Sequence, residues 1–232
     1  MKKYFFFLII LTHSISAQYT NINIIKEIHT KDKGMVVCAH PLASEAGAKI
    51  LKMGGNAFDA TIATQFALAV VYPQAGNIGG GGFLIGYTNK GEKIALDYRE
   101  TAPKKASKDM YLDKNGNANT DLSQNGRLAV GIPGSVSGMY FTHQKYGKLP
   151  ISVLIQPAID LAEKGFAVTE REANLLNATK EDFLKHNSHQ TAFTKENPWK
   201  QGDILVQKEL ANTLKLIQKN GEKAFYEGKN AQ

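Results

Sequence analysis

Cysteine is almost absent from this chain, because Cys38 is the only one among 232 residues. A single thiol cannot form a disulfide within the chain, so no covalent cross-link is available to hold the fold. The sequence also has no further Cys/His cluster to supply the ligands that Cys38 and His40 would need for a structural zinc site. The run "GMVVCAH" instead predicts a buried strand over residues 35–39 that contains an inert thiol.

Long apolar runs are also scarce. The one at residues 4–11 is too short to span a bilayer. Two lysines precede it and small residues follow as far as Ala17, which is the order found in secretory signal peptides. The sequence therefore predicts a signal peptide over residues 1–17 and a soluble exported product, periplasmic or secreted, with no membrane anchor. Residues 18–33 would lead into a domain over residues 34–232.

Positive charge is in excess but is not concentrated. The formal net charge is +7, and the lysines are spread over the polar region 102–127 and the C-terminal helices. Nucleic-acid binding would require a basic stripe with interleaved aromatic residues, and none is present. We therefore expect no nucleic-acid partner.

Glycine, in contrast, is concentrated in a run of four at residues 79–82. A dinucleotide-binding fingerprint needs glycines at positions i, i+2 and i+5, but Leu84 or Ile85 occupies the last of these. The run also leads into a strand and not into a helix N-terminus, and no P-loop motif follows. These glycines therefore predict a strand entry that passes close to a bulky group or a ligand.

Two helices near the start of the domain are indicated by their caps. Ser44 is expected to begin the first, which Gly54 and Gly55 end. Asn56 caps the second, and Asp59 lies in its first turn, where the helix dipole favours a carboxylate. The second helix is alanine-rich and apolar nearly all round, so it should be buried.

The remaining elements follow from the hydrophobic period and the turn residues. We expect helices over residues 56–71, 135–146, 150–164, 169–186 and 206–220, strands over residues 83–88 and 93–98, and a further short strand in "GRLAVGIPGS". Residues 102–127 form a polar connection long enough to be functional or mobile. Two or three strands make a small sheet for a chain of this size, which is typical of part of a domain.

The sequence contains no recognisable motif for a catalytic nucleophile. In "GIPGSVSG" neither Ser135 nor Ser137 has glycines at both −2 and +2, so Ser135 is better explained as a helix cap. Arg99, at the end of the second predicted strand, allows two interpretations. It can form a structural ion pair, the commoner role of arginine, or its planar guanidinium can clamp a substrate carboxylate.

Three blocks of the chain carry a specific resemblance. They are "GMVVCAHPLASEAGAKILKMGGNAFDATIATQFALAVVYPQAGNIGGGGFLI", "ALDYRETAP" and "GRLAVGIPGSVSGM". In this order they resemble the large-subunit region of γ-glutamyltransferases (γ-glutamyl transpeptidases). The resemblance extends from about Gly34 to the C-terminus and is strongest over residues 34–103 and 126–147.

The resemblance implies an α/β fold, the four-layer αββα sandwich of N-terminal nucleophile hydrolases, of which this chain would hold the helix-rich N-terminal part. It implies an exported proenzyme that cleaves itself and whose small subunit, the partner in a heterodimer, begins with a threonine nucleophile. That threonine would take the γ-glutamyl group from glutathione or a similar donor and pass it to an amino acid, a peptide or water. Neither a metal nor an organic cofactor is implied.

The resemblance also assigns roles to two residues of "LDYRE". Arg99 would bind the donor α-carboxylate, and Glu100 would support it. No catalytic residue is expected in this chain, because the threonine would lie beyond residue 232; the chain would then be a truncated or split precursor. Two alternatives remain: a related acylase acting on a glutaryl or poly-γ-glutamyl group, and a non-catalytic exported remnant.

Overall fold

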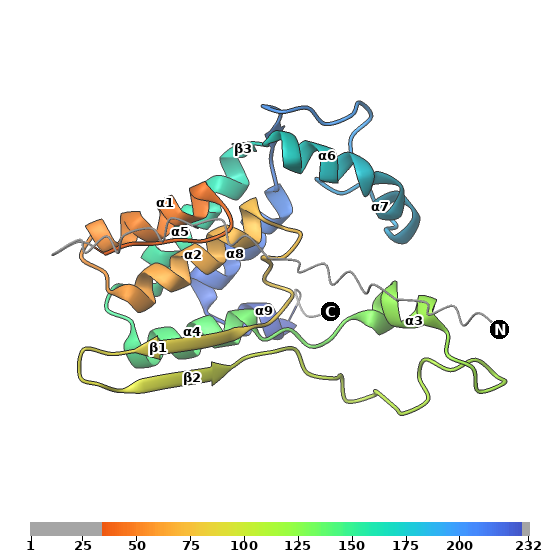
Figure 1. Ribbon diagram of the computed structural model, residues 1–232, viewed down its shortest axis with the longest axis horizontal. Helices are drawn as coiled ribbons and strands as arrows, with labels where there is room; N and C mark the ends of the chain where they lie inside the picture. Colours follow the sequence, from red (N-terminus) through yellow and green to blue (C-terminus); the bar gives the residue numbers. More distant parts are fainter. Residues whose placement is uncertain (1–33, 229–232) are drawn as a thin grey trace, which may run out of the picture. The chain divides into compact units, whose positions relative to one another are not determined.

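The computed structural model describes residues 34–228 (Figure 1). The predicted signal peptide over residues 1–17 and the lead-in over residues 18–33 lie outside the described residues, as do residues 229–232. Within the described range, no helix is both long and apolar enough to cross a membrane. This part of the chain is rich in helices and holds two small antiparallel sheets, in agreement with the sequence expectation.

Five helices form the core. They are α1 (Pro41–Lys52), α2 (Ala57–Val71), α4 (Ser135–Tyr146), α5 (Ile151–Lys164) and α8 (Lys208–Asn220). Helix α2 packs against α1, α4 and α5, and α8 packs on α5 (Figure 1). Most α2 side chains are buried, as predicted. Its small residues allow close approach: a Cβ added at Gly47 of α1 would lie 3.0 Å from the carbonyl oxygen of Ala60.

The start of α2 confirms the predicted cap. The Asn56 side chain accepts the backbone N–H groups of Phe58 and Asp59, and the Asp59 carboxylate accepts the N–H of Asn56 at 2.9 Å. Asp59 is fully buried and also accepts the N–H groups of Lys148 and Leu149, at 2.9 and 3.3 Å. This carboxylate therefore joins the start of α2 to the connection between α4 and α5.

The start of α1 differs from the prediction. Residues 35–39 form no strand, and Met35 and Val37 are exposed. His40 and not Ser44 caps the helix, because its Nδ1 accepts the N–H of Leu42 at 3.2 Å. The Ser44 hydroxyl lies instead 3.1 Å from the Cys38 thiol, inside the helix. Proline at the first helical position has a preset φ, which starts the helix four residues earlier than a cap at Ser44 would.

The predicted hairpin is confirmed. Strands β1 (Phe83–Tyr87) and β2 (Lys93–Asp97) pair antiparallel, with Phe83 opposite Asp97 and Tyr87 opposite Lys93. Leu84 on the inner face is buried. The other face of β1 is open: Phe83, Ile85 and Tyr87 are 63%, 82% and 70% exposed. An apolar sheet face is thus left uncovered by the described residues.

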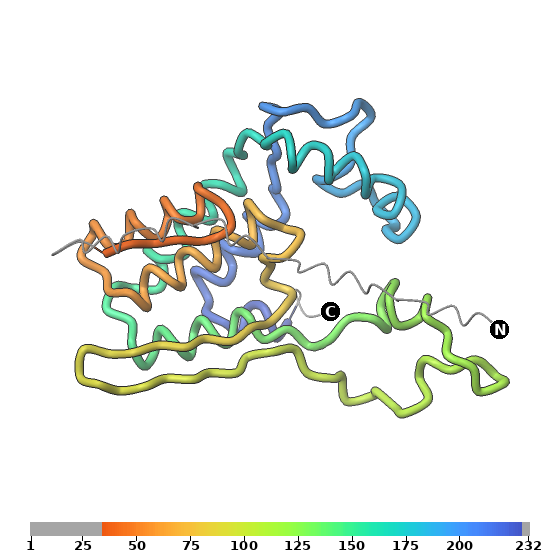
Figure 2. Tube along the Cα trace, in the orientation of Figure 1, coloured from red at the N-terminus to blue at the C-terminus, as the bar shows by residue number. Residues whose placement is uncertain are grey.

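The remaining elements are short. They are α3 (Thr120–Gln124), η1 (Arg127–Ala129), β3 (Phe166–Ala167), α6 (Glu170–Ala178), α7 (Lys180–His186), β4 (Ile204–Leu205) and α9 (Lys223–Tyr226). The helix predicted over residues 169–186 is divided at Thr179 into α6 and α7. Figure 2 shows the polar segment 102–127 as a long excursion between the hairpin and α4. The strand predicted in "GRLAVGIPGS" is reduced to one bridge, between Thr101 and Ile132.

Candidate functional site

The glycine run at residues 79–82 packs against the segment that carries Arg99. A Cβ added at Gly81 would lie 2.7 Å from both the Tyr98 carbonyl oxygen and the Glu100 backbone nitrogen. A Cβ at Gly82 would lie 2.9 Å from the Tyr98 ring. The described glycines with positive φ do not include this run, so contact and not backbone conformation explains these two glycines. The predicted close passage of the strand entry is confirmed.

A second set of glycines, at residues 134 and 138, also packs on the same segment. A Cβ at Gly134 would lie 2.7 Å from the Tyr98 carbonyl carbon, and one at Gly138 would lie 2.8 Å from the Tyr98 Cβ. The N–H groups of Gly134 and Ser135 both donate to the Gly80 carbonyl, at 2.8 and 3.0 Å. Backbone from two distant parts of the chain therefore encloses Tyr98.

The start of α4 corrects one sequence expectation. Gly134 is the N-cap residue and makes no side-chain cap. Ser135 is the first helical residue, and its buried hydroxyl has no hydrogen-bond partner among the described residues. The close contact between residue 134 and Tyr98 excludes a side chain at the cap position, so the helix begins on glycine.

Arg99 is exposed at the end of the hairpin. Its backbone N–H donates to the Asp97 carboxylate at 2.9 Å. Its guanidinium forms no ion pair and no hydrogen bond with any residue in the described range. Glu100 is likewise exposed, beside Gly80, and forms no ion pair there. The structural ion pair considered for Arg99 thus has no counterpart among residues 34–228.

Arg99 borders a cavity of about 380 Å³. Its lining comes from the end of the hairpin, the loop before α4, α4 itself and α9: Leu96, Asp97, Tyr98, Arg99, Thr101, Ile132, Pro133, Gly134, Ser137, Gly138, Phe141 and Tyr226. Apolar and aromatic groups form much of this wall, with the charges of Asp97 and Arg99 at one side. A cavity of this composition suits a small molecule that carries an anionic group.

Sequence reasoning missed Tyr226. Its hydroxyl accepts the N–H of Ser137 at 3.1 Å and donates to the Pro133 carbonyl at 3.0 Å, across 93 residues of sequence. Burial raises the pKa of the Tyr226 phenol, so the hydroxyl keeps the proton that it donates. No local pattern marks this residue, because only the packing of α9 against α4 brings it to the cavity.

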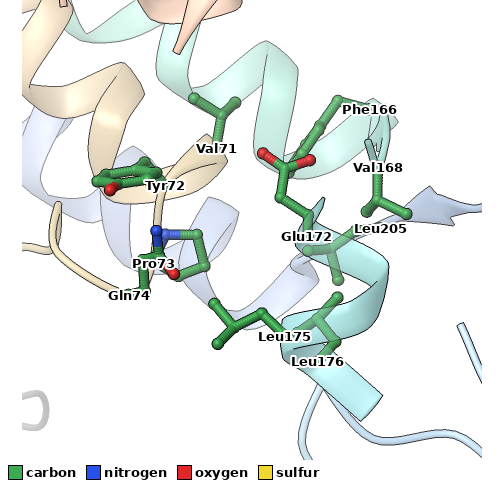
Figure 3. Close-up of a pocket in the computed structure, with 10 residues that line it drawn as sticks. All are labelled: Val71, Tyr72, Pro73, Gln74, Phe166, Val168, Glu172, Leu175, Leu176 and Leu205. Carbon is green, nitrogen blue, oxygen red and sulfur yellow. The ribbon is translucent and has the colours of Figure 1, made fainter. Parts of the chain in front are cut away.

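A second cavity, between the end of α2 and α6, is a weaker candidate (Figure 3). It measures about 30 Å³, and Glu172 alone among the residues drawn there is charged. The Glu172 carboxylate accepts the Thr169 N–H at 2.7 Å and lies 3.0 Å from Nε2 of His40. With its one charge engaged in this way, the cavity offers no free group for binding or catalysis. Elsewhere in the described range, no three His, Cys, Asp or Glu side chains are arranged to hold a metal ion.

Comparisons with known proteins agree with this architecture. The sequence matches the family model described as gamma-glutamyltranspeptidase over residues 43–232. It is 44% identical to the glutathione hydrolase proenzyme of Pseudomonas sp. strain A14, over 100% of this chain and 41% of that protein. The crystal structure of Helicobacter pylori gamma-glutamyltranspeptidase superimposes with a TM-score of 0.84 at 50% identity, covering 88% of this chain and 59% of that one.

A more distant likeness extends to an acylase. The cephalosporin acylase of Bacillus halodurans superimposes with a TM-score of 0.73 at 28% identity, over 86% of this chain and 38% of that one. The fold is therefore the helix-rich N-terminal part of an α/β N-terminal nucleophile hydrolase. Within that class, the chain belongs to the gamma-glutamyltranspeptidase family. It spans about two-fifths of the Pseudomonas relative, 41% of its length.

Proposed function

We propose that this chain is the large-subunit part of an exported γ-glutamyltransferase and that Arg99 binds the α-carboxylate of the donor. The observation that carries the proposal is the Arg99 guanidinium, which is exposed beside a cavity and free of ion pairs within the described range. A guanidinium presents two parallel N–H donors to a carboxylate, which fixes orientation as well as position. Glu100, the next residue, is proposed as a supporting group.

The chemistry would take place on a threonine that starts the small subunit, outside residues 1–232. Its hydroxyl attacks the γ-carbonyl of glutathione or another γ-glutamyl compound, and its own α-amine accepts the proton. The amine side of the donor leaves, and the γ-glutamyl group remains on the threonine as an ester. An amino acid, a peptide or water then attacks that ester. In this scheme the present chain binds and orients the donor, and no cofactor takes part.

The small subunit is proposed to come from the same precursor and to cover the open face of the hairpin. Phe83, Ile85 and Tyr87 form an apolar sheet face that is 63–82% exposed. Apolar faces of this kind normally pack on another layer. The relative from Pseudomonas is named a proenzyme, which agrees with a partner made by cleavage of one precursor. Export is proposed from the predicted signal peptide over residues 1–17.

A related acylase is the second candidate, favoured by the likeness to the cephalosporin acylase of Bacillus halodurans. Arg99 would serve equally well for the carboxylate of a glutaryl or poly-γ-glutamyl group. The two candidates differ in whether the site also requires the donor α-amine. Comparing γ-glutamyl and glutaryl anilides as substrates separates them, because an acylase would prefer the glutaryl compound.

The test begins with the nucleotide sequence that follows codon 232. A threonine-led segment there is expected, and its co-expression with this chain should give turnover of γ-glutamyl p-nitroanilide. A stop codon with no such segment nearby would remove the enzyme proposal for this gene. In the active protein, Arg99→Lys should chiefly raise the donor KM, and an unchanged KM would contradict the clamp.

A further inference from the structure

We propose that Tyr98 is a positioning residue that sets the direction of the Arg99 guanidinium and thereby the preference for donors with an α-carboxylate. This inference rests on the proposed function of Arg99. It assigns the selectivity of the site to a side chain that need not touch the carboxylate itself.

The Tyr98 ring is tightly packed. The ring lies between Gly82, at the entry to β1, and Gly138, in the first turns of α4. A Cβ added at Gly82 would lie 2.9 Å from Cε2 of the ring, and one at Gly138 would lie 2.8 Å from Cδ1. Both neighbours are backbone, which cannot turn aside as a side chain can. The ring is therefore fixed on both of its sides.

The backbone on either side of Arg99 is anchored by hydrogen bonds. The N–H of Tyr98 donates to the Gly82 carbonyl at 3.0 Å, and Thr101 and Ile132 exchange two hydrogen bonds of 3.1 and 2.8 Å. Arg99 thus lies between two anchored residues. Because the Tyr98 ring is held against α4, the backbone from which the Arg99 side chain projects is fixed at the edge of the cavity.

The ring of Tyr98, and not its hydroxyl group, holds the segment in place. The Tyr98 hydroxyl forms no hydrogen bond with a residue in the described range, and the nearest atom of Tyr98 to a Cβ added at Gly82 is the ring carbon Cε2, at 2.9 Å. Tyr98 also lines the cavity beside Arg99. Removing the ring would enlarge that cavity and free the segment to shift. A bidentate contact tolerates little displacement, since an error of about 1 Å can cost about 10²-fold in rate.

The experiment uses the assembled two-subunit enzyme and three p-nitroanilides. The γ-glutamyl compound has both the α-amine and the α-carboxylate, the glutaryl compound has only the carboxylate, and the 4-aminobutyryl compound has only the amine. Tyr98→Ala is expected to raise KM about 10-fold or more for the two carboxylate donors and to leave KM for the 4-aminobutyryl compound unchanged. Tyr98→Phe, which keeps the ring, should restore the parental KM ratios.

Two further variants distinguish a specific effect on Arg99 from a general loss of stability. Leu84→Ala removes a buried side chain from the same hairpin away from Arg99, so any general loosening should affect all three substrates alike. Gly138→Ala places a methyl group against the ring and should reproduce the carboxylate-selective rise. If Tyr98→Ala yields no folded enzyme, Tyr98→Leu and Gly138→Ala carry the same test.

The two proposals fail in different ways. If Arg99→Lys leaves KM for the carboxylate donors unchanged, the proposed role of Arg99 is wrong. If Arg99→Lys raises it but Tyr98→Ala and Gly138→Ala do not, only the positioning role of Tyr98 is overturned. An equal change with all three substrates would also overturn it, because that result reduces Tyr98 to a stability residue.

Discussion

The backbone of Gly134 packs directly on the carbonyl group of Tyr98, where an added Cβ would lie 2.7 Å from the carbonyl carbon. Gly81 packs on the same carbonyl, with an added Cβ at 2.7 Å from its oxygen. We expect Gly134→Ala and Gly81→Ala each to lower the free energy of unfolding by about 1–3 kcal/mol through overpacking. Denaturant unfolding of the full protein measures the change.

Gly79→Ala is the matched control from the same run. A Cβ there meets only the Asn77 side chain, at an ordinary distance of 3.6 Å, so stability should hardly change. Equal losses at residues 79 and 81 would show that the run is sensitive to any side chain and would contradict the contact argument.

The second prediction concerns Asp59, whose buried carboxylate accepts three backbone N–H groups. Asp59→Ala leaves these donors without partners, and each buried unpaired donor costs about 1–3 kcal/mol. We expect a loss of about 3 kcal/mol or more in the free energy of unfolding. Asp182→Asn, an exposed carboxylate in the first turn of α7, serves as the control and should cost a few tenths of that amount at most.

The third prediction concerns alkaline pH. Burial, with a smaller effect from Glu222, raises the pKa of Tyr140 from 10.0 to about 12. The folded protein therefore holds this proton more tightly than the unfolded chain, and its stability falls as pH rises from about 10 towards 12. In Tyr140→Phe the fall should be shallower. The variant should also lose about 1 kcal/mol at neutral pH, because the hydrogen bond to the Ile217 carbonyl is gone.

Urea unfolding at several pH values tests this behaviour. Tyr87→Phe is the control, since its ring is exposed on β1 and contributes no hydrogen bond in the described range. A Tyr140→Phe protein with the same alkaline slope as its parent would refute the assignment. Burial also raises the pKa of Tyr98 and Tyr226, so part of the slope should persist in the variant.

The fourth prediction concerns the wall of the cavity. Tyr226→Phe keeps the ring but removes the hydrogen bonds to Ser137 and Pro133. We expect a loss of about 1–2 kcal/mol in the free energy of unfolding and faster amide exchange in residues 131–137. Tyr87→Phe removes a hydroxyl that forms no hydrogen bond in the described range, so its exchange pattern in residues 131–137 should match the parent protein. Unchanged exchange in Tyr226→Phe would show that the hydroxyl does not hold the loop.

The fifth prediction tests the open face of the hairpin. Ile85→Lys puts a charge in the middle of that face and should abolish co-purification with a tagged small subunit, because the charge would be buried without a partner. Leu184→Lys, on the exposed side of α7, should co-purify normally.

The isolated large-subunit chain should lack a single sharp thermal transition, and observing one would favour a stand-alone binding protein.

Local signals predicted the parts of the fold that depend on neighbouring residues. The cap at Asn56, the burial of α2 and the hairpin follow from spacing and turn chemistry, and all three are confirmed. The prediction of a strand at residues 35–39 was wrong, since an apolar run needs a partner strand to form a strand. His40 displaced Ser44 as a cap because the proline that follows it starts the helix early.

In the candidate site, too, only the features that depend on neighbouring residues could be predicted from the sequence. The place of Arg99 at a strand end singled it out, but only the family resemblance favoured a binding role for it. The packing role of the glycines could be predicted from their failure to fit a phosphate motif. The residue that these glycines contact could not be predicted. Tyr98 contacts Gly134 and Gly138 only because the fold packs α4 against the end of the hairpin. Tyr226 lies still further along the chain, and no pattern around it hints at Pro133.

The bridge between Thr101 and Ile132 closes the polar excursion at its base. The segment between these two residues therefore begins and ends at the same place in the fold, next to Arg99. The number of residues in the excursion can therefore change without displacing the guanidinium, since lengthening a closed loop costs little free energy. A variant shortened within this segment should therefore keep Arg99 in place and, with it, the proposed carboxylate site.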